Sequence, residues 1–275
     1  ESKICEITGS NYAIATMNGT SALHVALKMV GVRSNDLVIT TPLTFVATPN
    51  AIFYNGARPI FLDVERKSLG LDPKQVESFL KDNTEIRNKK CIHKKSGKVI
   101  SCCLPVHIFG HPMNIEELIE VCSRNYIPVV EDSAESLGSY IGDKHTGTFA
   151  DVGIFSFNGN KTVTAGGGGA IVTNDEKLAR WAKHVTTTAK LPHPWEYDHD
   201  EVGFNYRMPN INAALLVAQL ENLDKFITNK RKIASSYEKF FKEIEYTFFK
   251  EPVHSRSNYW LNTIIFRDRQ QRDKF

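Results

Sequence analysis

The sequence has no long hydrophobic run, no paired-cysteine motif and no internal repeat, and each absence excludes a class of protein. The longest uninterrupted apolar stretch, 213–218, is far shorter than the roughly 18 to 20 residues that a membrane-spanning helix needs. No basic region leads into an apolar stretch near residue 1, so no secretory signal is predicted. With 41% hydrophobic and 24% charged residues, the composition is that of a globular α/β protein and excludes disorder, collagen and coiled coil.

The five cysteines form no CxxC pair and have no histidine at zinc-ligand spacing. Cys102 and Cys103 lie in an apolar, strand-like run, where buried and unreactive thiols are expected. We therefore predict no metal site and a reducing, cytoplasmic environment.

The net charge of +3 comes from one segment. Residues 81–98 contain seven Lys and Arg against two acidic residues, which leaves the rest of the chain near −2. Because this segment lacks the interleaved aromatic residues of nucleic-acid-binding stretches, we expect a solvated loop and no nucleic-acid partner.

Short apolar runs alternate with amphipathic segments along the first half of the chain. The pattern predicts strands and helices in the order 37–40 (strand), 44–54 (helix), 59–62 (strand), 99–106 (strand), 114–125 (helix) and 127–130 (strand). Such alternation is typical of a mostly parallel α/β sheet whose functional site lies at the carboxyl ends of the strands. Two later runs, 152–157 and 170–173, have no crossover helix between them and predict a hairpin-like excursion.

The last part of the chain predicts a long helix and a smaller unit. Pro209 opens a helix that runs to about residue 225, and its apolar stretch predicts burial in the core or against a second subunit. Strand-like runs at 246–249 and 259–266 then indicate a smaller α/β domain that is incomplete at Phe275. We place a large domain at 1–228 and the start of the smaller one at 229–275.

A phosphate site is indicated near the first predicted helix. Asn18-Gly19-Thr20-Ser21 precedes apolar residues at positions i, i+3, i+4 and i+7, and Gly31 ends the helix. A helix N-terminus with hydroxyl side chains is suited to bind phosphate, although most Asn and Thr residues at such positions only cap the helix.

Two charged residues lie at positions that are typical of catalytic residues. Asp132 directly follows a buried strand, where a carboxylate needs a cation or hydrogen bonds; capping the next turn is its alternative role. Lys161 lies in a tight loop before the glycines 166–169, which do not match a phosphate loop because no Gly directly precedes the Lys. A partly desolvated lysine is suited to Schiff-base chemistry.

These residues fall within six ordered blocks, which are Asn18–Leu23, Thr44–Thr48, Pro105–His107, Glu131–Glu135, Ser156–Gly169 and Gly203–Met208. In this order, and over nearly the whole chain, they resemble the DegT/DnrJ/EryC1/StrS family of nucleotide-sugar aminotransferases. The resemblance implies the PLP-dependent transferase fold type I, as in aspartate aminotransferase, and the cofactor pyridoxal 5′-phosphate (PLP). It also implies a homodimer with composite active sites.

The resemblance assigns roles to particular residues. Lys161 corresponds to the lysine that forms the Schiff base and shuttles the substrate proton, and Asp132 to the partner of the pyridine nitrogen. Thr20, Ser21 and Ser156 correspond to residues that hold the cofactor phosphate.

For several further residues the resemblance implies a role in the site, but another role is also open. Asn205 corresponds to a residue that reaches the phosphate of the neighbouring subunit, or else it caps a turn. Phe45 corresponds to the residue that stacks on the cofactor ring, or else it belongs to the core. Glu135 stands where many relatives have a Gln bonded to the phenolic oxygen of PLP, and His107 either lines the site or is structural. Arg58 and Arg207 are candidates to bind a diphosphate.

The loop before the lysine indicates the branch of the family. Glu135 with Asn158-Gly159-Asn160 is similar to enzymes that aminate C4 of 4-keto-6-deoxy sugars, both LegC-like enzymes with UDP-linked N-acetylated substrates and perosamine synthases with GDP-linked ones. Dehydratase relatives have His in place of Lys161. We predict amino transfer from L-glutamate to such a sugar, UDP-linked in the first place, for surface-glycan biosynthesis. The alternatives are a GDP-perosamine-type or 3-keto sugar aminotransferase, a catalytically silent PLP-binding regulator, and a nucleotide-binding protein without PLP.

Overall fold

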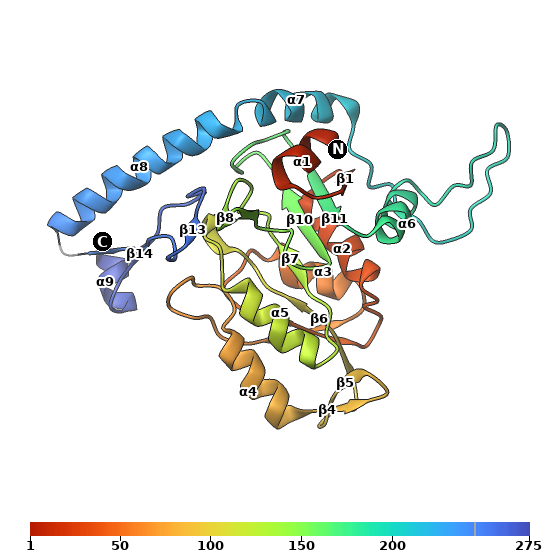
Figure 1. Ribbon diagram of the computed structural model, residues 1–275, viewed down its shortest axis with the longest axis horizontal. Helices are drawn as coiled ribbons and strands as arrows, with labels where there is room; N and C mark the ends of the chain where they lie inside the picture. Colours follow the sequence, from red (N-terminus) through yellow and green to blue (C-terminus); the bar gives the residue numbers. More distant parts are fainter. Residues whose placement is uncertain (245) are drawn as a thin grey trace.

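The computed structural model describes residues 1–244 and 246–275 (Figure 1). Its helices are α1 Ser2–Thr8, α2 Gly19–Met29, α3 Ala47–Tyr54, α4 Pro73–Asn83, α5 Ile115–Arg124, α6 Glu176–Thr186, α7 Asn210–Leu220, α8 Leu223–Glu243 and α9 Arg269–Lys274. Its strands are β1 Tyr12–Thr16, β2 Leu37–Thr40, β3 Arg58–Phe61, β4 Thr84–Arg87, β5 Lys90–His93, β6 Val99–Leu104, β7 Val130–Asp132, β8 Tyr140–Ile141, β9 Lys144–His145, β10 Val152–Ser156, β11 Gly169–Thr173, β12 Thr247–Phe248, β13 Ser255–Arg256 and β14 Ile264–Ile265.

The central sheet joins two sets of strands, in the orders β1-β11-β10-β7 and β3-β2-β6-β5-β4. Parallel bridges from Cys103 to Val129 and from Val106 to Asp132 connect β6 with β7. β2 pairs in parallel with β3 and β6, as β7 does with β10, whereas β11 is antiparallel to both β1 and β10. This confirms the mostly parallel sheet and the hairpin-like excursion after Asp132.

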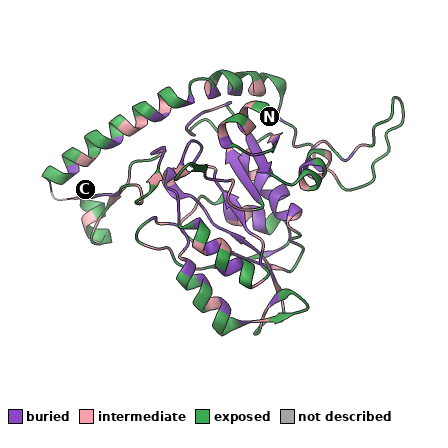
Figure 2. Cartoon of the chain, viewed as in Figure 1, coloured by how far each residue is buried: buried purple, intermediate pink, exposed green. Residues whose placement is uncertain are grey.

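Helices cover both faces of the sheet, because successive side chains of a strand point to opposite faces. In β6, Leu104 belongs to a core cluster with residues of α2, α3 and α6, whereas Cys103 belongs to one with residues of α4 and α5. In β10, Ile154 joins the first of these clusters, and Phe155 packs with residues of α1, α7 and α8. Figure 2 shows the result, a buried sheet between helices whose outer faces are exposed.

The last parallel strand before the site starts later than predicted. The sequence pattern places it at 127–130 with Asp132 beyond its end, but β7 spans Val130–Asp132. Pro128 has no N–H to donate to a neighbouring strand, and its carbonyl accepts the backbone N–H of Cys103 at 2.9 Å. Asp132 is therefore the final residue of the strand itself.

The solvated loop predicted for 81–98 is a β-hairpin instead. β4 and β5 pair antiparallel, and β5 continues onto β6, where Cys91 lies opposite Ile100. The burial of Cys91 at this contact explains why the segment forms strands despite its charge. Most of its Lys and Arg side chains are exposed, so the predicted solvation is confirmed.

The five cysteines are all free thiols. Burial raises the pKa of Cys102 and of Cys103 well above the ordinary value, which leaves both unreactive as predicted. Among the described residues, no group of three or more His, Cys, Asp or Glu is arranged to hold a metal ion. None of the described helices combines the length and the apolar character that crossing a membrane requires.

The helix after Pro209 differs from the prediction in extent and in burial. α7 ends at Leu220, and α8 continues after a short break to Glu243. Within the single chain only one face of α7 belongs to the core. Leu216 and Leu220 are buried there, whereas Ile211, Leu215 and Val217 are exposed. A second subunit is the alternative that the sequence left open.

The C-terminal part has a small core of its own. Residues from the second half of α8, among them Phe241, pack with Phe248 and Tyr259. The predicted strands at 246–249 and 259–266 are shorter in the structure, where β12 and β14 pair antiparallel. The boundary placed between 228 and 229 falls inside α8, and the division into two domains stays a prediction.

Candidate active site

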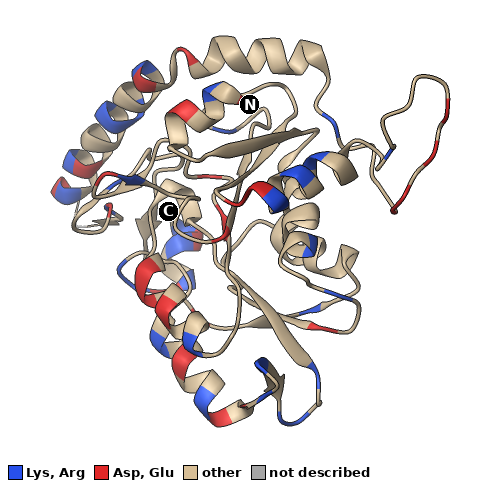
Figure 3. Cartoon of the chain, turned by 45° about the vertical axis from the view of Figure 1, so that its right-hand side comes forward, with Lys and Arg blue, Asp and Glu red and all other residues tan. Residues whose placement is uncertain are grey.

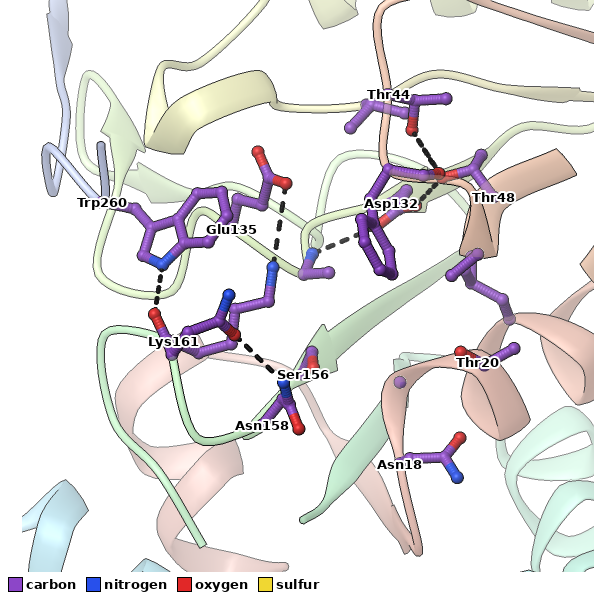
Figure 4. Close-up of a pocket in the computed structure, with 17 residues that line it drawn as sticks. Asn18, Thr20, Thr44, Thr48, Asp132, Glu135, Ser156, Asn158, Lys161 and Trp260 are labelled. Carbon is purple, nitrogen blue, oxygen red and sulfur yellow. Dashed lines mark hydrogen bonds and ion pairs between the residues drawn. The ribbon is translucent and has the colours of Figure 1, made fainter. Parts of the chain in front are cut away.

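A cavity of about 250 Å³ lies at the carboxyl ends of the parallel strands (Figure 4). Residues that follow β1, β2, β6, β7 and β10 line it, and they include Asn18, Thr20, Thr44, Phe45, Thr48, Val106, Asp132, Glu135, Ser156, Asn158, Asn160 and Lys161. Six of the eight predicted site residues are among them. The other two, Ser21 and Asn205, do not line this cavity.

Two glycines allow the N-terminus of α2 to reach the ends of β10 and β11. A Cβ on Gly19 would lie 2.8 Å from Cβ of Ser156, and one on Gly169 would lie 2.5 Å from the backbone oxygen of Asn18. The glycine run therefore permits a close crossing of backbone segments. Asn18 caps α2 by accepting the backbone N–H of Ser21 at 2.7 Å. Helix N-terminus and hydroxyls together make a donor set for a phosphate.

The two acidic residues at the end of β7, Glu131 and Asp132, point in different directions, one into the core and one into the cavity. Glu131 is fully buried, and its carboxylate accepts the backbone N–H groups of Gly147, Phe149 and Ala150 at 2.7 to 2.8 Å. Since neighbouring strand residues point to opposite faces, Asp132 is directed into the cavity instead. Glu131 is thus a structural carboxylate, and Asp132 is the one available to a ligand.

Asp132 is only 3% exposed, yet it has polar partners. Thr48 Oγ1 donates to Oδ2 at 2.7 Å, and the backbone N–H of Ala134 donates to Oδ1 at 3.2 Å. Burial raises the pKa of Asp132, while these two hydrogen bonds and the charge of Lys161 act against the rise. The two hydrogen bonds and Lys161 therefore offset part of the cost of burying the ionised carboxylate, and a cation or a protonated ring nitrogen in the cavity would favour that form further.

Lys161 and Glu135 form a nearly buried pair in the same cavity. Nζ of Lys161 lies 3.7 Å from Oε1 of Glu135, and the two side chains are 11% and 5% exposed. Glu135 also accepts the backbone N–H of Phe109 at 2.6 Å. Burial raises the pKa of Glu135 to about 7 and lowers the pKa of Lys161, although each group's charge opposes the shift of the other. Because a lower pKa means more neutral amine at neutral pH, Lys161 is suited to attack a carbonyl carbon.

Trp260 lines the cavity and was missed by the sequence analysis. Its ring centre lies 3.9 Å from Nζ of Lys161, and its indole N–H donates to the backbone oxygen of Asn160 at 2.7 Å. No spacing or motif connects a tryptophan in a strand-like run with a lysine far earlier in the chain. A role for Thr48 was also missed, although Thr48 lies in the first turn of α3 and only four residues after Thr44.

The remaining candidates lie elsewhere. His107 is fully buried, where the backbone N–H of Met113 donates to its Nδ1 and its Nε2 lies 2.9 Å from Glu131. His107 is therefore structural, the second of its two predicted roles. Neither Arg58 nor Arg207 lines the cavity.

The model of the DegT/DnrJ/EryC1/StrS aminotransferase family matches residues 1–275. The chain belongs to this family. Its relatives include the GDP-perosamine synthases of Escherichia coli O157:H7, which is 38% identical over 100% of this chain and 70% of that protein, and of Vibrio cholerae, which is 36% identical over 96% and 68%. Among solved structures, a DegT DnrJ EryC1 StrS aminotransferase from Brucella abortus superposes with a TM-score of 0.87 and 28% identity over 98% of this chain and 69% of that one.

Family membership establishes the fold type I architecture and the dependence on PLP. The chain spans about two thirds of the length of these relatives. The cavity also fits the cofactor chemically. It presents an amine for an aldehyde, a buried carboxylate for a pyridine nitrogen, and a helix N-terminus with two hydroxyls for a phosphate.

Proposed function

We propose that this chain transfers an amino group from L-glutamate to C4 of a nucleotide-linked 4-keto-6-deoxy sugar. The observation that supports it most is the convergence of Lys161 and Asp132 on one cavity that also contains Thr20 and Ser156. These side chains come from three separate segments, and together they suit the aldehyde, the ring nitrogen and the phosphate of one cofactor.

In this proposal Lys161 and Asp132 are the catalytic pair. Bound PLP supplies an aldehyde and a ring that accepts electrons when the substrate Cα loses its proton. Asp132, kept ionised by Thr48, holds the proton on the ring nitrogen. With PLP bound, the amine of Lys161 would carry the proton between the substrate Cα and the cofactor carbon that bore the aldehyde, so that one side chain would serve as anchor and as acid and base.

Thr20, Ser156 and the N-terminus of α2 bind the phosphate in the proposed complex. Phe45 is 67% exposed, which excludes the alternative that it belongs to the core and leaves its ring free to stack on the cofactor. Ser21 contributes only through α2, because its backbone N–H is already bonded to Asn18 and its side chain is buried.

The nucleotide of the acceptor separates two versions of this proposal. The relatives named GDP-perosamine synthases favour a GDP-linked sugar. The UDP-linked N-acetylated sugar is the version that the sequence analysis put first, although Glu135 and 158–160 are similar to both groups of enzymes. An amination assay with glutamate and a panel of GDP-, UDP- and dTDP-linked 4-keto-6-deoxy sugars distinguishes them, since product from one nucleotide class alone identifies the acceptor. A panel without any product contradicts the proposed reaction.

The reaction with glutamate alone, which is the first half of the amino transfer, distinguishes a catalyst from a protein that only binds the cofactor. Purified protein with PLP is expected to absorb in the visible region, and glutamate is expected to bleach that band. Lys161→Ala is expected to lack the band. A wild-type band that glutamate leaves unchanged supports the silent regulator, and a protein that gains no band with PLP supports the nucleotide-binding alternative.

The proposal includes a homodimer, because α7 carries no charged residue and exposes Ile211, Leu215 and Val217 (Figure 3). Light scattering is expected to report twice the chain mass for the wild type and a lower mass for Val217→Glu. Lys239→Glu, an exposed change on α8, is expected to leave the mass unchanged.

Composite sites are tested by mixing two inactive variants. Asn205 is exposed and lies outside the cavity of its own chain, as a residue that serves a neighbouring site would. Mixed dimers of Lys161→Ala and Asn205→Ala chains then contain one intact site, and activity well above either parent is expected. No recovery in a confirmed mixed dimer contradicts the composite site. We also propose a reducing cytoplasmic location, supported by the five free thiols.

A further inference from the structure

Trp260 contacts the reactive amine from a distant part of the chain. The ring centre lies 3.9 Å from Nζ of Lys161, and the same amine lies 3.7 Å from Glu135 (Figure 4). A cation over the face of an indole ring is stabilised by the negative potential of that face. Trp260 and Glu135 therefore both favour the charged form of the amine, against the burial that favours the neutral form.

The indole ring is held in place by hydrogen bonds at two points. Its Nε1–H donates to the backbone oxygen of Asn160, the residue before the lysine, at 2.7 Å. The backbone N–H of Trp260 donates to Oδ1 of Asn258 at 2.8 Å. Asn258 is itself fully buried, and its amide donates to the backbone oxygen of Glu135 at 2.8 Å. The ring is thus tied to both segments that carry the charged pair.

We propose that Trp260 is a positioning residue, which holds the protonated amine of Lys161 inside the cavity until an aldehyde arrives. The inference rests on the proposed role of Lys161. A long lysine side chain otherwise extends its amine toward water, and a ring face at the amine opposes that motion. The amine must lose its proton before it adds to a carbonyl carbon. Its rate of addition therefore reports how strongly the cavity holds the charged form.

Two substitutions separate the ring face from the hydrogen bond. Trp260→Leu removes the face, whereas Trp260→Phe keeps a ring and loses only the indole N–H. The measurement is the reaction of Lys161 with acetic anhydride in the cofactor-free full chain, followed against pH by mass spectrometry of the peptide that contains it. The midpoint is the pH at which Lys161 is labelled at half its maximal rate. We expect this pH to fall by about half a unit to one unit in Trp260→Leu and to stay near that of the wild type in Trp260→Phe.

Several results would overturn the inference. An unchanged midpoint in Trp260→Leu shows that the ring does not hold the charge, and equal shifts in both variants assign the effect to the indole hydrogen bond. Circular dichroism verifies folding, and Trp260→Met replaces the leucine variant if that one does not fold. Because labelling needs no cofactor, a shifted midpoint in a chain that takes up no PLP contradicts the proposed function while leaving the positioning by Trp260 intact.

Discussion

Thr48 Oγ1 donates to the carboxylate of Asp132 at 2.7 Å, across 84 residues of sequence. Thr44 Oγ1 lies 2.6 Å from Thr48 Oγ1. A hydroxyl has one hydrogen to donate. While Asp132 is ionised, Thr48 gives its hydrogen to the carboxylate, and Thr44 must be the donor to Thr48. The two threonines thus form a chain of hydrogen bonds that favours the charged carboxylate in a buried place.

Thr48→Val is expected to raise the pKa of Asp132, because the carboxylate loses a hydrogen bond to its charged form while its burial is unchanged. A hydrogen bond to a charged group contributes roughly 1.5 to 3 kcal/mol, which corresponds to about one pH unit or more. A smaller fraction of Asp132 is then ionised at acidic pH. The acidic limb of the pH profile of kcat/KM is expected to move to higher pH by about this amount.

Thr48→Ser keeps the hydroxyl and serves as the matched control. Its acidic limb is expected to stay near that of the wild type. If valine and serine variants show the same limb, Thr48 acts through packing and not through its hydrogen bond.

Glu135→Gln is expected to stabilise the cofactor-free chain in a pH-dependent way. Burial raises the pKa of Glu135 from 4.5 to about 7, so the folded chain retains a proton that the unfolded chain releases in this range. The stability that this group contributes is present below the lower value and is lost as pH rises through the higher one. At about 1.4 kcal/mol per unit, the loss is roughly 3 kcal/mol.

Melting temperatures of both proteins, measured from mildly acidic to mildly alkaline pH, check this expectation. The advantage of the glutamine variant is expected to grow with pH and then to level off. Glu120→Gln, an exposed change on α5, is expected to show no such trend. A difference between Glu135→Gln and the wild type that is constant with pH contradicts the assigned pKa shift.

Gly169→Ala is expected to destabilise the chain by about 1 to 3 kcal/mol, the usual cost of overpacking. Its new Cβ would lie 2.5 Å from the backbone of Asn18, which cannot move away as a flexible side chain does. Gly167→Ala is the matched control, since the nearest atom to its Cβ would be 3.7 Å away. Urea unfolding measures both. Equal stabilities would mean that β11 and α2 can separate without cost.

Local patterns predicted the parts of the fold that depend on neighbouring residues. The strand at 37–40 was predicted with the bounds that β2 has, and the helix predicted at 114–125 corresponds to α5, Ile115–Arg124. β1 went unpredicted because its pairing is with β11, more than 150 residues later, and its short sequence carries little pattern of its own. The hairpin of β4 and β5 was not predicted, because its many charged residues indicated a solvated loop.

The same distinction holds for the site. Lys161 follows a strand and Asp132 ends one, and at such positions the residue type alone suggests chemistry. Trp260 could not be found in this way, because its place over the amine depends on the buried Asn258 and on how the C-terminal segment docks. Asp132 was chosen over Glu131 through the family resemblance, because the pattern of the strand alone does not show which of the two side chains faces the cavity.

Glu131→Gln is expected to be the most destabilising of these changes, although Glu131 does not line the cavity. The carboxylate is fully buried and accepts three backbone N–H groups, with Nε2 of His107 2.9 Å away. An amide places an NH₂ group against at least one of those donors and leaves it unsatisfied, which costs roughly 1 to 3 kcal/mol for each buried group. Chemical unfolding is expected to show a loss of at least this size, with Glu120→Gln unchanged. A variant as stable as the wild type would show that the loop at 147–150 has another way to satisfy its backbone. In that case the division of the acidic pair into a structural and a cofactor-facing residue loses its main support.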